Sequence, residues 1–230
     1  MNLIVLLDFD GVLFDSALEV YKICEKLTKG KKKFRQGIKY IEFLKYRPLV
    51  TDAWQYSLIY NQKKFDKNLK SFAGILPDTD DIAFSKKFFE IRTKISTNNY
   101  FDLIKPYNFF IKLRPLLLKY PDNFNILSTR NRNSIEKILI KHKIKKIKFF
   151  GQEDIKKYGS KISVFKKVIN LKDDKFVIYI DDINEHLVPF KKEIDLTVQA
   201  NWGYGNISKN SFDQEYCLKL ISSFIKLNNN

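Results

Sequence analysis

The stretch Leu3-Ile4-Val5-Leu6-Leu7-Asp8-Phe9-Asp10-Gly11 decides the fold of this chain. Five aliphatic residues followed at once by charge and glycine predict a strand buried on both faces, as in a parallel sheet covered by helices. Ligands of such sheets collect at the carboxyl ends of the strands, where Asp8 and Asp10 would lie. Since side chains alternate along an extended chain, the two carboxylates can flank one point, and Gly11 permits a tight turn past it. A simple Asx turn is the alternative.

A second apolar strand is predicted at Asn125-Ile126-Leu127 and ends in the hydroxyl pair Ser128-Thr129, followed by Arg130. A hydroxyl at this edge can donate a hydrogen bond to a phosphoryl oxygen, which either residue could do. We select Ser128, with Thr129 as the alternative. The same residues are also typical of a cap before a helix at 134–142.

A lysine is the third candidate, Lys161 in the segment Gly159-Ser160-Lys161-Ile162 at the predicted start of a helix. An ammonium group fixed there would neutralise a nucleophilic carboxylate and a phosphoryl group that otherwise repel each other. The chain is rich in lysine, so Lys156 and Lys157 compete for this position, and a solvated surface charge is the simpler alternative.

The fourth segment is Phe176-Val177-Ile178-Tyr179-Ile180-Asp181-Asp182, again an apolar run that ends in carboxylates. Mg²⁺ prefers oxygen ligands and commonly uses one or two carboxylates together with water and phosphate oxygens. The pair Asp181 and Asp182 therefore predicts a magnesium site, without indicating which of the two is the ligand.

These four segments, in this order, resemble the signatures of the haloacid dehalogenase (HAD) superfamily, whose phosphatases carry Asp-x-Asp-Gly at the end of the first strand. The resemblance covers residues 1–14 and roughly 105–227. It departs from the family after Asp182, where a further Asp or Asn often follows and this chain has Asn184, Glu185 and His186. The residue that orients the metal ligand therefore stays open.

The order of the predicted elements gives the architecture. Strands near 124–128, 146–150, 175–181 and 195–200 alternate with helical patterns, which predicts an α/β fold with a Rossmann-like, doubly wound parallel sheet. The long interval after Asp15 has helical spacing instead, in segments 17–27, 37–46, 52–61 and 82–95. We therefore expect a core domain at 1–14 and 105–230 and an inserted all-helical cap domain at 15–104. Such a cap resembles the phosphoglycolate phosphatase and β-phosphoglucomutase-like group.

The predicted cap is expected to select the substrate, because a closing lid excludes water and completes a site. Arg47 is the nominated substrate contact, since arginine suits bidentate anion binding, although most arginines are solvated charges. Another loop, Asn201-Trp202-Gly203-Tyr204-Gly205-Asn206, is similar to a glycine-rich loop of the family. Its glycines predict a turn rather than a contact with substrate.

The resemblance implies a mechanism and a role for each residue. Asp8 would be the nucleophile that forms an aspartyl-phosphate, and Asp10 the general acid and base. Ser128 and Lys161 would complete the catalytic set and hold the phosphoryl oxygens. The implied Mg²⁺ ligands are Asp8, Asp10, Asp181 and Asp182, and the implied substrate contacts are Ser128, Thr129, Arg130, Lys161 and Arg47.

We therefore expect a Mg²⁺-dependent phosphatase, a phosphoric monoester hydrolase acting on a small phosphorylated metabolite. Dehalogenases of the superfamily lack the second aspartate, so Asp10 favours phosphoryl transfer. A sugar phosphomutase or a phosphonate hydrolase of the same fold stays open, because these differ in the cap. The alternative from another class is a non-catalytic protein whose basic surface binds nucleic acid or an acidic partner.

Composition narrows the choice of partner and compartment. The 230 residues include 42 basic and 26 acidic side chains, a net charge of +16, and such a field attracts phosphates of any kind. Lysine is abundant throughout together with Asn and Ile, which favours biased composition over a nucleic-acid surface. The two cysteines have no metal-knuckle spacing, and the first apolar run is too short for a signal peptide or a membrane helix. We expect a cytoplasmic protein with no membrane partner; the oligomeric state is not indicated.

Overall fold

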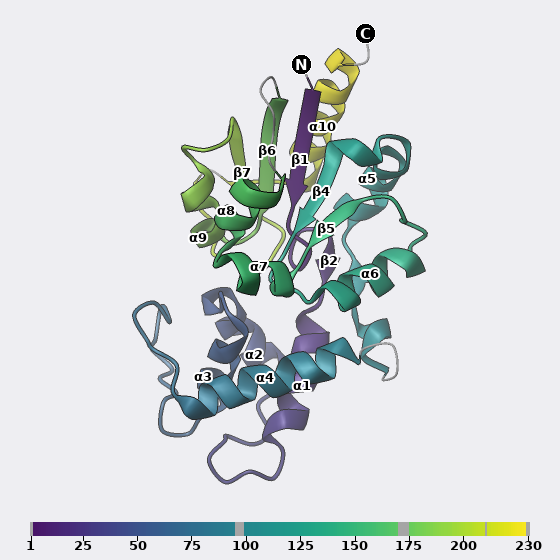
Figure 1. The fold of residues 1–230 in the computed structure, drawn as a ribbon. Coiled ribbons are helices and arrows are strands. Elements are labelled where there is room, and N and C mark those ends of the chain that lie inside the picture. Colours follow the sequence, from purple (N-terminus) through teal and green to yellow (C-terminus); the bar gives the residue numbers. More distant parts are fainter. Residues whose placement is uncertain (1, 95–98, 170–174, 210, 229–230) are drawn as a thin grey trace. The chain divides into compact units, whose positions relative to one another are not determined.

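The computed structural model describes residues 2–94, 99–169, 175–209 and 211–228. The chain divides into two compact units, which are coloured along the sequence in Figure 1. The first, here called the α/β unit, comprises Met1–Asp15 and Lys105–Asn230, and the second, the helical unit, comprises Ser16–Ile104. The chain therefore leaves the α/β unit after its first strand and returns to it about ninety residues later.

A six-stranded parallel sheet forms the centre of the α/β unit, in the order β5-β4-β1-β6-β7-β8. β1 lies in the middle, and the chain continues from it toward β4 on one side and from β6 toward β7 on the other, which defines a topological switch point. The predicted doubly wound sheet is confirmed. Its strands are β1 (Asn2–Leu7), β4 (Phe124–Leu127), β5 (Lys148–Phe150), β6 (Lys175–Asp181), β7 (Leu196–Ala200) and β8 (Ser211–Phe212).

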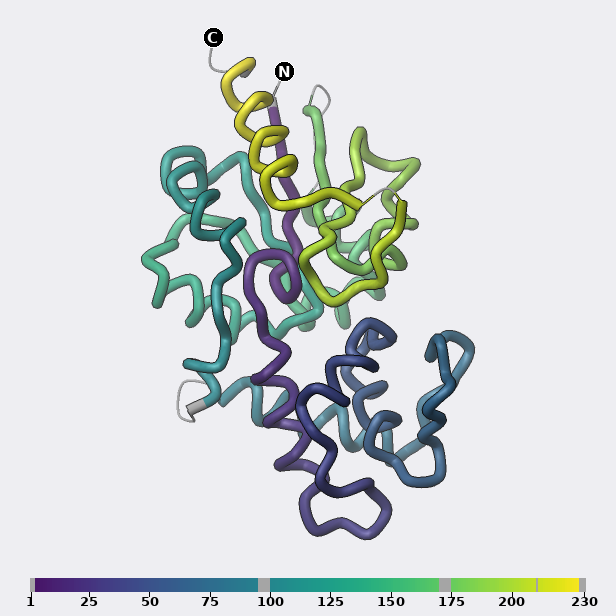
Figure 2. Tube along the Cα trace, turned by 180° about the vertical axis from the view of Figure 1, so that it is seen from behind, coloured from purple at the N-terminus to yellow at the C-terminus, as the bar shows by residue number. Residues whose placement is uncertain are grey.

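Helices cover both faces of this sheet, which explains why β1 is aliphatic from Leu3 to Leu7. On one face Ile4 and Leu6 pack with the helical segments that carry Val164, Phe165 and Leu187. On the other face α10 (Gln214–Asn228) lies against β1 and α5 (Asn108–Lys119), as Figure 2 shows from behind. The remaining helices of this unit are α6 (Arg132–Lys141), α7 (Gln152–Tyr158), α8 (Lys161–Val164), which continues as a π-helical turn to Ile169, and α9 (Asn184–Leu187).

A two-stranded antiparallel ribbon marks the point where the insertion leaves and returns. β2 (Phe14–Asp15) pairs with β3 (Lys105–Pro106), so both ends of the insertion lie side by side. Between β1 and this ribbon, residues 9–13 form a tight turn in which the amides of Leu13 and Phe14 both donate to the Phe9 carbonyl. This turn brings the chain directly past the end of β1.

The helical unit has its own apolar core, as the helical spacing of the sequence predicts. Its helices are α1 (Ala17–Thr28), α2 (Tyr40–Tyr46), α3 (Tyr56–Tyr60) and α4 (Thr79–Thr93), with short 3-10 turns at Arg47–Leu49, Ala53–Gln55 and Asn99–Leu103. The core includes Ile23, Phe43 and Phe88. The last predicted segment, 82–95, begins later than the real helix, which starts at Thr79 behind an Asp78 cap; its final residue, 95, lies outside the described part.

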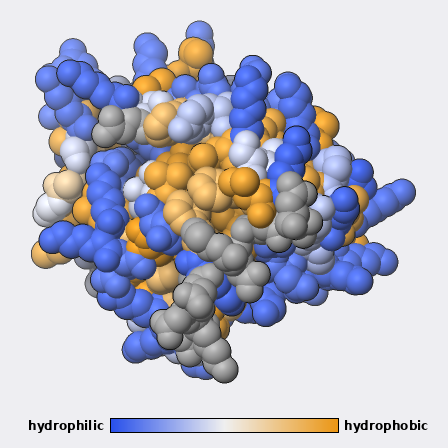
Figure 3. Space-filling view, turned by 90° about the horizontal axis from the view of Figure 1, so that it is seen from above, coloured by the Kyte–Doolittle hydropathy of each residue, from blue (hydrophilic) through white to orange (hydrophobic). Residues whose placement is uncertain are grey.

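The face at which β1 begins carries a central group of apolar residues ringed by hydrophilic ones (Figure 3).

None of the described helices is both long and apolar enough to cross a bilayer. Cys24 and Cys217 are free, buried thiols. The β-strand at 211–212 was not predicted, because two residues are too few to show a periodic pattern.

Candidate active site

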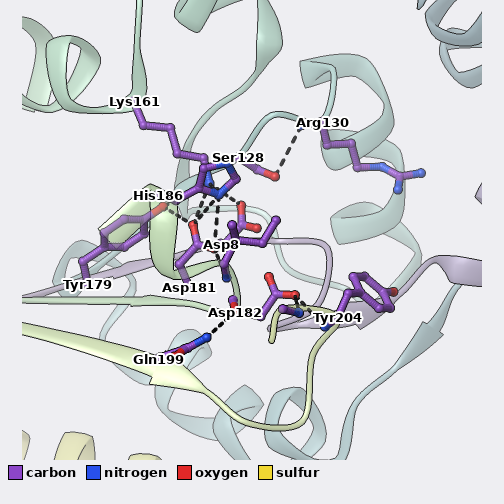
Figure 4. A network of polar contacts seen from close by, with 12 residues as sticks. Asp8, Ser128, Arg130, Lys161, Tyr179, Asp181, Asp182, His186, Gln199 and Tyr204 are labelled. Atoms are coloured by element: carbon purple, nitrogen blue, oxygen red, sulfur yellow. Dashed lines mark hydrogen bonds and ion pairs between the residues drawn. The ribbon is translucent and has the colours of Figure 1, made fainter. Parts of the chain in front are cut away.

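The carboxylates of Asp8 and Asp181 meet at the carboxyl end of the sheet because of strand register. Leu6 lies opposite Tyr179 in the parallel ladder, and the Asp8 amide donates to the Ile180 carbonyl at 2.9 Å. Side chains two residues apart share a face, so Asp8 follows Leu6 and Asp181 follows Tyr179 toward the helices of that face. Figure 4 shows these side chains converging at the strand ends. The predicted clustering of the first and fourth segments is therefore present in the fold.

Lys161 lies at the centre of this cluster, at the first position of α8. Its Nζ donates to Asp8 Oδ1 at 3.1 Å and to Asp181 Oδ2 at 2.7 Å. Two further groups surround the ammonium, the Tyr179 hydroxyl at 3.0 Å and His186 Nδ1 at 3.3 Å. Gly159 has φ +99°, a left-handed conformation that favours glycine and ends α7 just before α8 begins. Three lysines competed for this position in the sequence: Lys156, Lys157 and Lys161. The one selected there, Lys161, is the lysine whose Nζ contacts both carboxylates.

Burial and the neighbouring charges shift the pKa values of Asp8, Asp181 and Lys161. Burial is the main cause that raises the pKa of Asp8 to about 7, with Lys161 opposing it and Asp181 and Asp182 adding to it. Burial also disfavours the ionised form of Asp181, but Lys161 and His186 outweigh it and hold the pKa of Asp181 well below its usual range. Although burial lowers the pKa of Lys161, the two carboxylates raise it overall. The lysine is therefore a permanent cation, matched against more than one acid.

Asp182 is held by the glycine-rich loop. Its Oδ2 accepts hydrogen bonds from the backbone amides of Tyr204 at 2.6 Å and Gly205 at 3.2 Å. A Cβ atom built on Gly203 would lie 2.3 Å from the Asp182 Cβ, and one on Gly11 would lie 2.4 Å from Oδ2. Only glycine permits this approach. The expectation that these glycines shape a turn was incomplete, because the turn packs directly on Asp182.

Asp10 and the segment after β4 form the other side of the site. Ser128 is fully buried at the end of β4, and its Oγ accepts from the Arg130 amide at 3.3 Å, while Thr129 is only half-buried. The Arg130 guanidinium donates to Asp10 Oδ1 at 2.8 Å and to Ser134 Oγ at 2.7 Å. The cap of α6 is at Asn131, so Ser128 belongs to the strand end and not to the helix start.

Arg47, the nominated substrate contact, belongs to the helical unit. Its side chain is buried there, donates to the Val50 carbonyl at 3.2 Å and lies over the Tyr56 ring at 5.6 Å. These contacts give Arg47 a place in the core of its own unit. Its role toward a substrate stays a prediction.

Sequence reasoning missed three side chains of the α/β site. Tyr179 donates its hydroxyl proton to Asp181 Oδ2, and His186 Nδ1 lies 3.3 Å from Asp181 Oδ1. The Tyr204 hydroxyl donates to Asp15 at 2.8 Å. His186 had a signal, because it stands where the family pattern departs. The alternation that places Tyr179 two residues before Asp181 could have indicated Tyr179 as well.

The carboxylates suit a hard divalent cation. One oxygen from each of Asp8, Asp181 and Asp182 lies within 4.8 Å of the others, and all three residues are buried. Oxygen donors of this kind are those that Mg²⁺ prefers. Three buried carboxylates lie together here and Lys161 pairs with two of them, so an added cation would stabilise the cluster.

The comparisons with known proteins agree with this architecture. No protein-family model matches the chain, and neither does any curated protein. Among solved structures, it is similar to a predicted phosphatase from Clostridium acetobutylicum (16% identity, TM-score 0.63, covering 97% of this chain and 99% of that one). It is also similar to a haloacid dehalogenase-like family hydrolase from Streptococcus pneumoniae (13%, 0.64, 96% and 98%) and to a predicted phosphoglycolate phosphatase from Haemophilus somnus (13%, 0.62, 96% and 98%). At these identities the likeness confirms the HAD-like fold with its helical insertion.

Proposed function

We propose that this protein is a Mg²⁺-dependent phosphatase that hydrolyses a small phosphomonoester. The observation that carries the proposal is the ion pair of Asp8 with Lys161, both buried at the carboxyl end of the sheet beside two further carboxylates. Isolated buried charges are expensive, so a cluster with this excess of acid indicates a site that binds and acts rather than one that stabilises the fold. The names of the similar structures support the choice of phosphatase.

The reaction would proceed in two displacements at phosphorus. An Asp8 carboxylate oxygen attacks phosphorus, the bond to the ester oxygen breaks, and Asp10 gives its proton to the leaving oxygen. Asp10 then takes a proton from water as the water oxygen attacks the aspartyl-phosphate, which releases inorganic phosphate and restores Asp8. Ser128 and Lys161 would donate to the phosphoryl oxygens, whose charge they stabilise.

Asp8, the Asp10 carbonyl and Asp182 are the proposed Mg²⁺ ligands, and the ion would supply charge stabilisation to the transferring phosphoryl group. Asp181 is better suited to holding Lys161. Its Oδ1 accepts from the Ile183 amide at 2.9 Å, and its Oδ2 accepts from both Lys161 and Tyr179. Asp182 instead has its Oδ2 anchored by two backbone amides, an arrangement that fixes a ligating carboxylate.

The test is phosphate release from a panel of phosphomonoesters with and without Mg²⁺. We expect Mg²⁺-dependent turnover that falls by a factor of about 10⁴ or more in Asp8→Asn, because the nucleophile is lost. Glu193→Gln is the matched control, since it removes an exposed carboxylate that pairs with Lys166 on the same unit. Absence of turnover with every ester, from folded protein, would overturn the proposal.

A further inference from the structure

Arg130 is a more deeply buried cation than Lys161, and its guanidinium pairs with Asp10. Its side chain is 0% exposed and that of Asp10 is 11% exposed. The guanidinium is held on three sides, by Asp10 Oδ1, by Ser134 Oγ and by the Phe9 ring, whose centroid is 5.6 Å away. In Figure 4 its side chain leaves the loop in the direction opposite to Lys161.

The backbone of Arg130 is equally constrained. Its amide donates to Ser128 Oγ, and its carbonyl accepts from the Gln152 amide at 2.9 Å at the start of α7. A Cβ atom on Gly151 would lie 2.7 Å from that carbonyl, so glycine is needed for the approach. The side chain therefore projects from a fixed point toward Asp10, which is 120 positions away in the sequence.

We infer that Arg130 is a positioning residue that fixes the Asp10 carboxylate for proton transfer. The inference rests on the proposed function and replaces the expectation that Arg130 binds the substrate. A buried guanidinium bound on several sides is preorganised, and it would cost much to turn it toward a ligand. Fixing the general acid matters because proton transfer requires the donor within hydrogen-bond reach of the leaving oxygen.

The test compares leaving groups. An alkyl phosphomonoester needs a proton on its leaving oxygen, whereas p-nitrophenyl phosphate releases a stable anion. We expect Arg130→Gln to lower kcat/KM for the alkyl ester by about 100-fold and for the aryl ester by less than about tenfold. kcat/KM is the right quantity because it reports the steps up to release of the first product. Asp10→Asn should show the same selectivity, and the double variant should lose nothing more.

An equal loss on both esters would overturn the inference, because a phosphate contact or a purely structural role affects both alike. Arg132→Gln is the control, because Arg132 lies two positions after Arg130 and is an exposed arginine that pairs with Asp154. If Arg130→Gln fails to fold, Ser134→Ala removes one hydrogen bond to the guanidinium and should show the same selectivity at about tenfold. Turnover absent from the wild type itself would instead refute the proposed function, so the two failures are distinguishable.

Discussion

The two units each bury charged side chains, but they balance them differently. In the helical unit Arg92 meets Glu19 in a bidentate pair, with Nη2 to Oε2 at 2.9 Å and Nε to Oε1 at 3.1 Å. In the α/β unit Lys161 faces Asp8 and Asp181, and Asp182 adds a third buried acid. A matched pair leaves neither buried charge without a partner, whereas an excess of buried acids costs stability and is kept for binding and chemistry.

Breaking the matched pair should have the largest effect on stability. Glu19→Gln or Arg92→Met leaves one buried charge without its partner and should lower the free energy of unfolding of the protein by about 3 to 5 kcal/mol. Chemical denaturation would measure it. The double variant Glu19→Leu with Arg92→Met should recover most of the loss, because no charge is then left buried. Glu215→Gln, in an exposed pair with Lys219, should leave the denaturation midpoint in place.

Removing one acid from the cluster of Asp8, Asp181 and Asp182 should have the opposite effect and raise the stability of the protein. The pKa of Asp8 is raised from 3.8 to about 7, so folding favours its protonated form. The favourable contribution is full below the unfolded value of 3.8 and is lost as the pH rises through about 7. At about pH 8, without metal, Asp8→Asn should therefore be more stable than the wild type by about 4 kcal/mol, a gain that disappears at about pH 4.

Thermal unfolding in the presence of a chelator, at both pH values, measures this difference. Added Mg²⁺ should stabilise the wild type at the higher pH and stabilise Asp8→Asn much less, because the ion binds the folded cluster. An Asp8→Asn variant that is less stable than the wild type at high pH would contradict the assignment of Asp8 to an unmatched cluster.

Mg²⁺ affinity should distinguish the roles of Asp181 and Asp182. We expect Asp182→Asn to weaken Mg²⁺ binding by about 100-fold and Asp181→Asn by about tenfold, because Asp182 is the proposed ligand and Asp181 is bound to Lys161. Calorimetric titration of the metal, or Mn²⁺ electron paramagnetic resonance, gives the two affinities without any substrate. The reverse order of effects would show that Asp181 is the ligand.

The smallest effect is expected at Tyr179. Burial raises the pKa of Tyr179 well above its usual value, so the hydroxyl stays a hydrogen-bond donor to Asp181. Tyr179→Phe removes that donor and should lower kcat by about tenfold, equivalent to about 1.4 kcal/mol, with little change in KM. Phe212→Leu, at a half-buried ring in the last strand, is the control. A change confined to KM would mean that Tyr179 contacts the substrate.

The sequence by itself determined five of the six strands of the sheet, the position of the helical insertion and the residues at the strand ends. These depend on local patterns: aliphatic runs that stop at Asp8 and Asp181, and helical spacing across the interval between Asp15 and Lys105. Such patterns follow from the geometry of the strand and the helix, so they can be read without knowing which parts of the chain meet.

Only the tertiary structure decided how these residues are used. Lys161 is 153 positions from Asp8, Arg130 is 120 from Asp10, and the amide of Tyr204 is 22 from Asp182. No periodic pattern links such positions, since their contact arises from the order of strands in the sheet and from loops that pack on them. The separate orientations of the adjacent Asp181 and Asp182 have the same origin, because successive side chains of a strand point to opposite faces and meet different neighbours.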